Sequence, residues 1–170
     1  MNNIRRNEAS VLKLDGERAL LIQQLYQNLV MYWDEVDERG GERAAEYFTE
    51  DGVFDGGTHK QVGREAIAGF YRWRAGRGAR LSRHVVTNFR VQQVAPDRAI
   101  STWMMLLYAA DGEPVLPSLP AIAISEITDV NVLCDDGLWR YESRSFKALF
   151  KGGAPTTVPP KDAIENAKRT

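Results

Sequence analysis

The sequence predicts an α+β domain in which helices come first and long antiparallel strands follow. Helical periodicity runs through residues 15–39 and 62–78, whereas apolar and polar residues alternate along much of residues 80–149. Turn signals divide that second region into four strands. Helices that precede a run of strands are typical of α+β folds. A curved sheet wrapped around a long helix would leave a cavity between them, and such a cavity is a common ligand site.

Three helices are expected in the first half of the chain. Asp15 can cap a long helix that runs to about Arg39, and "RGG" at 39–41 ends it. Its apolar stripe includes Leu21, Leu25, Leu29, Trp33 and Val36. "ERAAEYF" predicts a short second helix, which the turn "TEDG" ends. A short strand, "VFDG", and a loop that contains His59 precede the third helix, "VGREAIAGFYRWRAGRG".

Four long strands are expected in the second half, over residues 80–94, 98–109, 121–134 and 138–149. The "DDG" turn between the last two is a hairpin signal. Along the first of these strands, strict alternation divides the side chains between two faces. One face would carry Ser82, His84, Val86, Asn88 and Arg90, and the other Leu81, Arg83, Val85, Thr87, Phe89 and Val91.

Length and composition indicate one ordinary globular domain. The chain has 170 residues and a formal net charge of −1, which gives no basic footprint for nucleic acid or for a membrane surface. We expect a loose lead-in over residues 1–14, the domain over 15–150 and a proline-containing tail over 151–170, which can serve as an arm onto a partner subunit. No apolar run approaches the ~20 residues that cross a bilayer, and no secretory signal is recognisable.

Cofactor and metal sites are not indicated by the sequence. Cys134 is the only cysteine, and two carboxylates beside it disfavour a reactive thiolate. The two histidines, His59 and His84, lack the spacing of a metal-ligand motif, and no nucleotide-binding glycine motif is present. We therefore expect neither a metal nor a cofactor. A reducing, cytoplasmic compartment fits the single cysteine.

The order of several motifs resembles the SnoaL-like branch of the nuclear transport factor 2-like superfamily. The motifs are "EYFTEDGVFDGG", "VGREAIAGFY", "RHVVTNFRV" and "DDGLWRYESRSFK", and the resemblance covers about residues 15–150. It implies a cone-shaped α+β barrel, with three N-terminal helices packed on a curved, mostly antiparallel sheet that encloses a pocket. Members include polyketide cyclases, scytalone dehydratase, a bile-acid dehydratase, a hexachlorocyclohexane dehydrochlorinase and proteins without catalysis, so the fold alone leaves the function open.

The resemblance also implies a site. In the dehydratase and dehydrochlorinase members, an aspartate near the end of the first helix pairs with a histidine on the first long strand, which corresponds to Asp37 and His84. A tyrosine five residues before that aspartate corresponds to Tyr32, and an arginine on the last strand to Arg144. Dehydratase members place a further acid or histidine on the next strand, where "STWMMLLYA" offers only Ser101 and Thr102.

These residue types suit proton abstraction from carbon. A histidine with a pKa near 6.5 can act as a base at neutral pH, and an aspartate bound to one ring nitrogen fixes its tautomer. Tyr32 could hydrogen-bond a substrate oxygen, and Arg144 could stabilise developing negative charge. On an ideal helix Tyr32 and Asp37 point about 140° apart, so Asp34 is a second candidate for the orienting acid.

Other readings of these residues stay open. Arg144 can instead be a structural ion-pair partner, for example of Glu126 or Glu142. Tyr32 can be core packing with its hydroxyl at the rim, and His59 is expected at the surface.

The sequence thus favours a cofactor-independent lyase or isomerase that acts on a hydrophobic cyclic or aromatic small molecule. The alternative is a binding module without catalysis, or an accessory subunit of a ring-hydroxylating oxygenase. By analogy we expect a homo-oligomer, either a dimer or a trimer.

Overall fold

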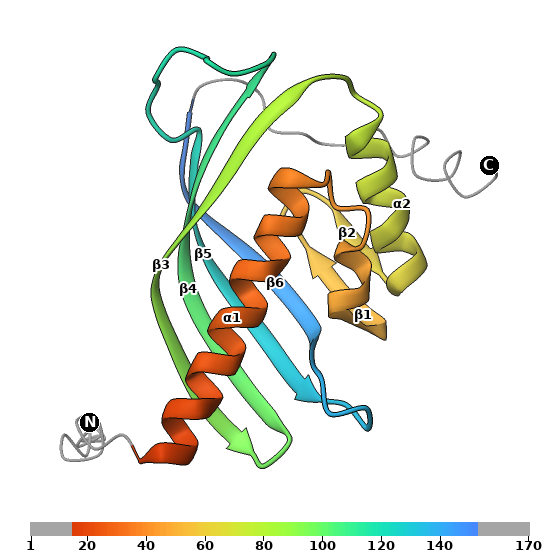
Figure 1. Ribbon diagram of the computed structural model, residues 1–170, viewed down its shortest axis with the longest axis vertical. Helices are drawn as coiled ribbons and strands as arrows, with labels where there is room; N and C mark the ends of the chain where they lie inside the picture. The colour runs from red at the N-terminus through yellow and green to blue at the C-terminus, as the bar shows by residue number, and fades with distance from the viewer. Residues whose placement is uncertain (1–14, 153–170) are drawn as a thin grey trace, which may run out of the picture.

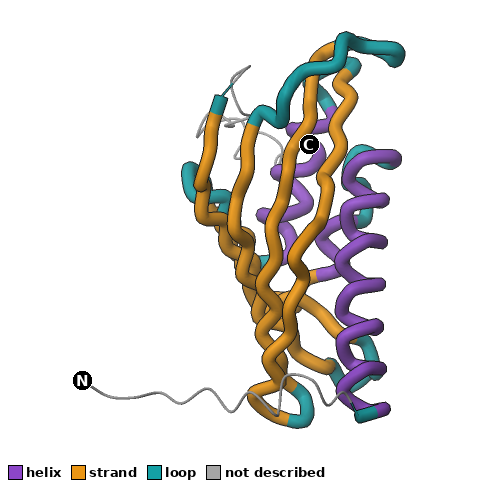
Figure 2. Tube along the Cα trace, turned by 90° about the vertical axis from the view of Figure 1, so that its left-hand side faces the viewer, coloured by secondary structure: helices purple, strands orange, loops and turns teal. Residues whose placement is uncertain are grey.

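The computed structural model describes residues 15–152, which form two α-helices, one 3-10 turn and a six-stranded sheet (Figure 1). The sheet order is β2-β1-β6-β5-β4-β3, with antiparallel neighbours except for the parallel pair β1 and β6. Both helices lie on one side of this curved sheet, and within residues 15–152 no helix covers its other side (Figure 2). The predicted α+β class is therefore confirmed. The lead-in over residues 1–14 and the tail beyond residue 152 lie outside the described residues.

Helix α1 (Gly16–Glu38) begins and ends close to the predicted residues. The Asp15 carboxylate accepts a hydrogen bond from the Arg18 backbone N–H at 2.8 Å and so caps the helix. The predicted apolar stripe is buried against the sheet. At the other end, Gly41 adopts a φ of +83°, and its N–H donates to the Glu35 carbonyl at 3.0 Å. The stripe and the two capped ends explain why this helix could be predicted from the sequence.

The expected second helix is a correction, because the structure has two α-helices rather than three. Only Ala44–Tyr47 turn, as a 3-10 segment, and strand β1 (Phe48–Asp55) runs through the expected "TEDG" turn. Phe48 is fully buried, and the Arg64 guanidinium donates to its carbonyl at 2.7 and 3.0 Å. The pairing of β1 with β6 shifts register between Phe48 and Val53, so the polar residues form an irregularity within a strand.

Strand β2 (Lys60–Val62) was expected as loop and pairs with β1, and helix α2 (Arg64–Ala75) follows it. Three residues are too short to show an alternation in the sequence. The four long strands agree with their predicted bounds to within two residues. They are β3 (Arg80–Ala95), β4 (Arg98–Asp111), β5 (Ala123–Leu133) and β6 (Trp139–Lys151).

A bulge at Asn88 changes which residues of β3 face the core. Asn88 has a φ of +55°, and the pairing with β4 shifts register between Thr87 and Arg90. Before the bulge, His84 faces the helices, as the alternation predicts. After it, Phe89 also packs into the core, in edge contact with Tyr26 at 5.4 Å between ring centroids. The prediction that Phe89 lies on the face opposite His84 is therefore wrong, because strict alternation cannot register an inserted residue.

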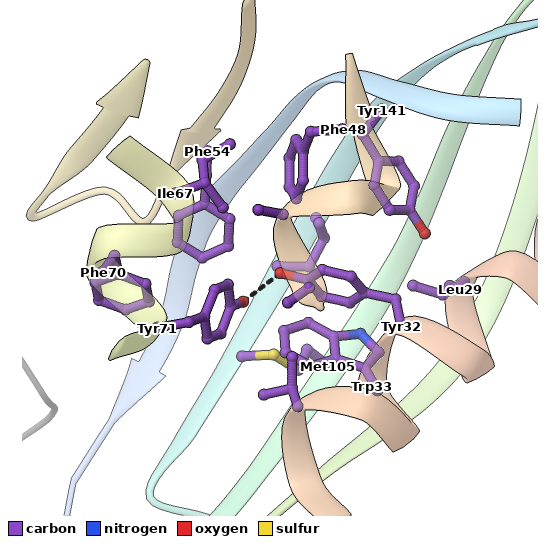
Figure 3. Close-up of a cluster of buried hydrophobic side chains, with 14 of the residues drawn as sticks. Leu29, Tyr32, Trp33, Phe48, Phe54, Ile67, Phe70, Tyr71, Met105 and Tyr141 are labelled. Atoms are coloured by element: carbon purple, nitrogen blue, oxygen red, sulfur yellow. Dashed lines mark hydrogen bonds between the residues drawn. The ribbon is translucent and has the colours of Figure 1, made fainter. Parts of the chain in front are cut away.

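The core is unusually rich in aromatic rings where α1, α2 and the sheet meet (Figure 3). Tyr32 and Phe48 are fully buried there, and Tyr32 makes edge contacts with Phe48 and Tyr141 at 6.0 and 5.7 Å. Several rings of this packed cluster, such as Phe54, Phe70 and Tyr71, also line the cavity described below.

Candidate functional site

A cavity of about 420 Å³ lies between the two helices, the β1–β2 turn and the inner face of the sheet. Its apolar walls include Val36, Phe54, Phe70, Met105, Leu107 and Phe146. Its polar lining includes His59, Tyr71, Arg74, Ser82, His84 and Ser125. Among the described residues that line it, none is an aspartate or glutamate. An apolar cavity with a few convergent polar groups is the expected form of a small-molecule site.

His84 and Asp37 are joined at two points. The His84 ring Nδ1 lies 2.6 Å from Asp37 Oδ1, and the His84 backbone N–H donates to Asp37 Oδ2 at 2.8 Å. Both side chains are more than nine-tenths buried, with 9% and 8% exposed. With Nδ1 occupied by the carboxylate, Nε2 is the nitrogen left for a ligand.

The carboxylate of Asp37 is itself held in place from the sheet and from α2. Ser82 donates its hydroxyl to Asp37 Oδ1 at 2.8 Å, and Arg74 donates to the Ser82 hydroxyl oxygen, also at 2.8 Å. Asp34, the second candidate, instead pairs with Arg39 at 2.8 Å on the surface. Of the two aspartates, Asp37 is the one that contacts His84.

Trp33 fixes the plane of the His84 ring. The two rings stack with their centroids 3.9 Å apart and an interplanar angle of 12°. Stacking on one face and hydrogen bonding at one edge leave the imidazole little rotational freedom. The free nitrogen is thus oriented before any ligand arrives.

The electrostatic environment keeps His84 neutral and Asp37 charged. Burial lowers the pKa of His84 below 6.5, and the positive charges of Arg74 and Arg144 act in the same direction against the opposing effect of Asp37. For Asp37, burial raises the pKa, but the hydrogen bonds and charge of His84 outweigh it, so the pKa falls below its ordinary value. A neutral imidazole beside a carboxylate is a competent proton acceptor at neutral pH.

Tyr32 does not line the cavity, but its partner Tyr71 does. Tyr32 is fully buried, and its hydroxyl is hydrogen-bonded to the hydroxyl of Tyr71 (Figure 3). Gly41 makes room for this arrangement, because a Cβ added there would lie 2.3 Å from the Tyr71 ring. Tyr71 was not among the site residues that the sequence predicted. Its place beside Phe70 on the inner face of α2 was the one available signal.

Arg144 lies behind the cavity wall, fully buried. Its Nε and Nη2 donate to Asp129 at 2.7 and 2.8 Å, and Asp129 also accepts a hydrogen bond from the Trp103 indole at 2.8 Å. The guanidinium carbon lies 4.4 Å from the centre of the Tyr32 ring. Burial would lower the pKa of Arg144, but Asp129 raises it well above its ordinary value, so the charge is retained.

The ion-pair reading of Arg144 needs one correction. Its partner is Asp129 and not Glu126 or Glu142, since Glu142 pairs with Arg98 at 2.9 Å and Glu126 lies 3.5 Å from Lys147.

His59 is also corrected, since the sequence placed it at the surface. Its ring lines the cavity and stacks on Phe70, with centroids 4.9 Å apart. The signal that the sequence reading missed is the "GG" pair at 56–57, which allows the turn to fold its next histidine inward.

The strand after His84 adds no acid or histidine to the cavity. On β4 the cavity is lined by Met105, Leu107 and Ala109, while Ser101 is buried and accepts a hydrogen bond from the Asn131 side chain at 3.0 Å. The further acid or histidine of the dehydratase members is therefore missing from β4 in the structure as well as in the sequence. The additional polar groups of the cavity come from α2, as Tyr71 and Arg74.

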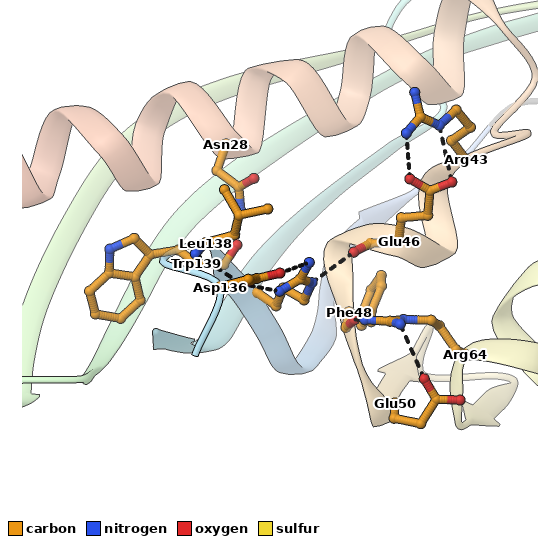
Figure 4. A network of polar contacts seen from close by, with 10 residues as sticks. Asn28, Arg43, Glu46, Phe48, Glu50, Arg64, Asp136, Leu138 and Trp139 are labelled. Carbon is orange, nitrogen blue, oxygen red and sulfur yellow. Dashed lines mark hydrogen bonds and ion pairs between the residues drawn. The ribbon is translucent and has the colours of Figure 1, made fainter. Parts of the chain in front are cut away.

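A second, more open groove lies on the other side of α1. Its rim is polar and carries ion pairs, such as Arg43 with Glu46 and Arg140 with Asp136 (Figure 4). These charges already satisfy one another, so the first cavity is the better candidate site. Within residues 15–152, no helix is long and apolar enough to cross a membrane, and no cluster of three or more metal-ligating side chains is found.

A family model described as a SnoaL-like domain matches residues 17–145. No match to a curated protein is found. Among solved structures, a candidate scytalone dehydratase from Novosphingobium aromaticivorans is 17% identical with a TM-score of 0.69, over 84% of this chain and 94% of that one. A Catenulispora acidiphila protein in complex with S-DNPA is 24% identical with a TM-score of 0.66, over 76% and 94%.

A third structure, ActVI-ORFA from Streptomyces coelicolor, is 19% identical with a TM-score of 0.64, over 75% of this chain and 96% of that one. At these identities the likeness to solved structures shows a shared fold.

Proposed function

The chain belongs to the SnoaL-like domain family, and we propose that it is a cofactor-independent lyase or isomerase acting on a hydrophobic cyclic or aromatic small molecule. In this proposal His84 removes a proton from a carbon atom, and Asp37 orients His84. The observation that carries it is the 2.6 Å contact from His84 Nδ1 to Asp37 in a side chain that lines the cavity. An oriented base within a water-poor cavity is what this chemistry requires.

The chemical step begins at Nε2 of His84. The C–H bond breaks, its proton moves to Nε2, and its electron pair stays on the substrate as an enolate or a similar anion. The Asp37 carboxylate stabilises the imidazolium that forms. The anion then either expels a leaving group, which is elimination, or takes a proton at another carbon, which is isomerisation. General-base help of this kind contributes about 10²–10⁴-fold.

The anion formed in this step needs positive or hydrogen-bonding groups near it. Tyr71 and Arg74 line the same cavity, and we assign the direct contact with a substrate oxygen to the Tyr71 hydroxyl. Tyr32 and Arg144 assist from behind the wall. The Tyr32 hydroxyl is hydrogen-bonded to the Tyr71 hydroxyl. Burial raises the pKa of Tyr32, and the positive charge of Arg144, which lies against the Tyr32 ring, offsets part of that rise.

The side chains that line the cavity indicate the class of substrate. Phe54, Phe70 and Phe146 suit a flat ring, and the absence of acids among the described lining residues admits a neutral or anionic molecule. The Catenulispora acidiphila protein of the same fold was solved in complex with S-DNPA, which supports ligand binding by a chain of this fold.

Deuterium exchange tests the reaction without knowledge of the leaving group. The probe is 2-tetralone, a ketone fused to an aromatic ring, incubated in D₂O with the protein and followed by NMR. We expect exchange above the uncatalysed background with the wild type and none with His84→Ala. Equal exchange with both would contradict the role of His84.

Binding without chemistry is the second candidate, as a carrier of small molecules or an accessory subunit of a ring-hydroxylating oxygenase. The apolar β4 lining favours it, because Met105 and Leu107 bring no acid or histidine to the cavity. Saturable binding of 2-tetralone with no exchange above background would support this reading.

We also propose that the protein is a cytoplasmic homo-oligomer. The face of the sheet away from the helices carries the apolar side chains of Val85 and Tyr108, which are 45% and 42% exposed. A dimer and a trimer both remain open, and sedimentation equilibrium distinguishes them.

A further inference from the structure

We propose that His59 is a second polar anchor in the cavity, which binds a hydroxyl group on an aromatic ring of the ligand. The assignment rests on the proposed function, because it takes the cavity as the substrate site. His59 comes from the turn between β1 and β2, whereas the base His84 comes from β3. The two histidines would hold two different parts of one molecule.

The turn that carries His59 holds the imidazole ring against the aromatic wall of the cavity. The ring stacks on Phe70 with an interplanar angle of 24° and lies 5.8 Å from the Phe54 ring. The Gly56 N–H donates to the His59 carbonyl at 2.9 Å, which closes the turn. A Cβ added at Gly56 would lie 2.4 Å from the imidazole Cε1, so only glycine leaves room for this position.

The imidazole of His59 presents an unsatisfied nitrogen. Nε2 is buried and has no hydrogen-bond partner within residues 15–152. Nδ1 lies 3.4 Å from the Thr58 hydroxyl, and the nearby Asp55 carboxylate is occupied by the Gly57 N–H at 3.0 Å. A buried polar atom without a partner costs free energy, and a ligand that supplies the partner recovers it. Burial also lowers the pKa of His59, so the ring is neutral at neutral pH.

The neutrality of the ring decides which ligand group fits. In a neutral imidazole Nε2 is either a donor or an acceptor, depending on the tautomer. A hydroxyl can pair with either form, whereas a carbonyl or ether oxygen pairs only with the donor form. Because the neighbouring wall is aromatic, through Phe54, Phe70 and Phe146, we assign the hydroxyl to an aromatic ring.

The two histidines lie against different aromatic rings of the cavity wall. His59 stacks on Phe70, and His84 stacks on Trp33. Figure 3 shows Tyr71 between Phe70 and Trp33. A ligand whose hydroxyl is held by His59 would extend past Tyr71 toward His84. His59 would then fix which carbon of the ligand meets the base, which makes it a determinant of specificity rather than of the chemical step.

Two probes that differ in one group test this assignment. 2-Naphthol carries a hydroxyl, and 2-methylnaphthalene carries a methyl group at the same position. By titration calorimetry we expect the wild type to bind 2-naphthol about tenfold more tightly, as one buried hydrogen bond allows. In His59→Phe, which keeps a ring against Phe70, the preference should fall to about twofold or less. An unchanged preference, or failure of 2-naphthol to bind the wild type, would overturn the inference.

The control is His84→Gln, which should lose exchange activity but keep the preference for 2-naphthol. If the preference vanishes in His84→Gln and survives in His59→Phe, then His84 reads the hydroxyl and the inference is wrong. These are binding measurements on probes that need not react, so they stand or fall separately from the exchange assay with 2-tetralone.

A spectroscopic measurement on the wild type covers the case in which His59→Phe does not fold. The chain has only two histidines, so ¹⁵N labelling of histidine gives few signals, which the titration with each probe can follow. We expect 2-naphthol, but not 2-methylnaphthalene, to shift the Nε2 signal of His59. No difference between the two probes at that nitrogen would also overturn the inference.

Discussion

The Asp37 carboxylate holds both the ring and the backbone of His84, with one oxygen 2.6 Å from Nδ1 and the other 2.8 Å from the backbone N–H. The end of α1 and the middle of β3 are thereby fixed to each other at the cavity wall. The same two contacts serve the fold and the proposed chemistry, since they set both the strand position and the imidazole tautomer.

The first prediction concerns the charge of Asp37. Asp37→Asn keeps the shape of the side chain but removes the acceptor that selects the tautomer of His84. We expect the exchange rate of 2-tetralone to fall by about 10²–10⁴-fold with little change in probe affinity. Asp34→Asn is the matched control, because Asp34 pairs with Arg39 at the surface, and this substitution should leave the rate unchanged. Equal losses in both variants would contradict the assignment.

The second prediction is a pH profile. His84 must be neutral to accept a proton, and burial lowers its pKa below 6.5. The rate should therefore be constant at neutral pH and fall only as pH drops through that lowered pKa. Because the same histidine in the unfolded chain takes up its proton near 6.5, the free energy of unfolding should also decrease as pH falls below that value. A rate that rises steeply above pH 7 would contradict this environment.

The third prediction separates the two buried tyrosines. Tyr71→Phe removes the hydroxyl of a residue that lines the cavity, whereas Tyr32→Phe removes the hydroxyl of its hydrogen-bond partner behind the wall. We expect a loss of rate of about 10²-fold for Tyr71→Phe and a smaller loss for Tyr32→Phe. Rate constants from the exchange assay decide between them. A larger effect of Tyr32→Phe would mean that the cavity opens to Tyr32 in solution.

The fourth prediction is structural and concerns Arg144. Arg144→Met leaves the Asp129 carboxylate fully buried without its partner, which should lower the free energy of unfolding by about 3–5 kcal/mol. The double variant Arg144→Met with Asp129→Leu removes both charges and should recover part of that loss, as measured by urea denaturation. If the double variant is no more stable than Arg144→Met, the ion pair does not account for the effect.

Sequence patterns predicted the elements whose signal is long and repeated. Five apolar residues at helical spacing specified α1, and strand-like patterns with turn signals between them specified the four long strands. Local exceptions could not be seen in the same way. The polar stretch before Val53 reads as a turn but is an irregularity within β1, and Asn88 inserts one residue into β3 and reverses the faces that follow.

The residues of the candidate site also differ in how well the sequence could predict them. Asp37 and His84 could be named because each sits in a motif whose position resembles a known family, and the structure brings them together. The direction of a buried side chain depends instead on partners distant in the sequence. Arg144 turns to Asp129, fifteen residues away on the neighbouring strand, and Tyr71 reaches Tyr32 on another helix. Nothing local to these residues encodes those contacts.

The tautomer of His84 at neutral pH tests the central claim most directly, and ¹⁵N NMR of the labelled wild type measures it without any substrate. If Asp37 orients a free base, Nδ1 carries the proton and Nε2 is unprotonated, and Asp37→Asn changes that distribution. A proton found on Nε2, or a doubly protonated ring at pH 7, would contradict the account, because His84 could then accept no proton from a ligand in the cavity.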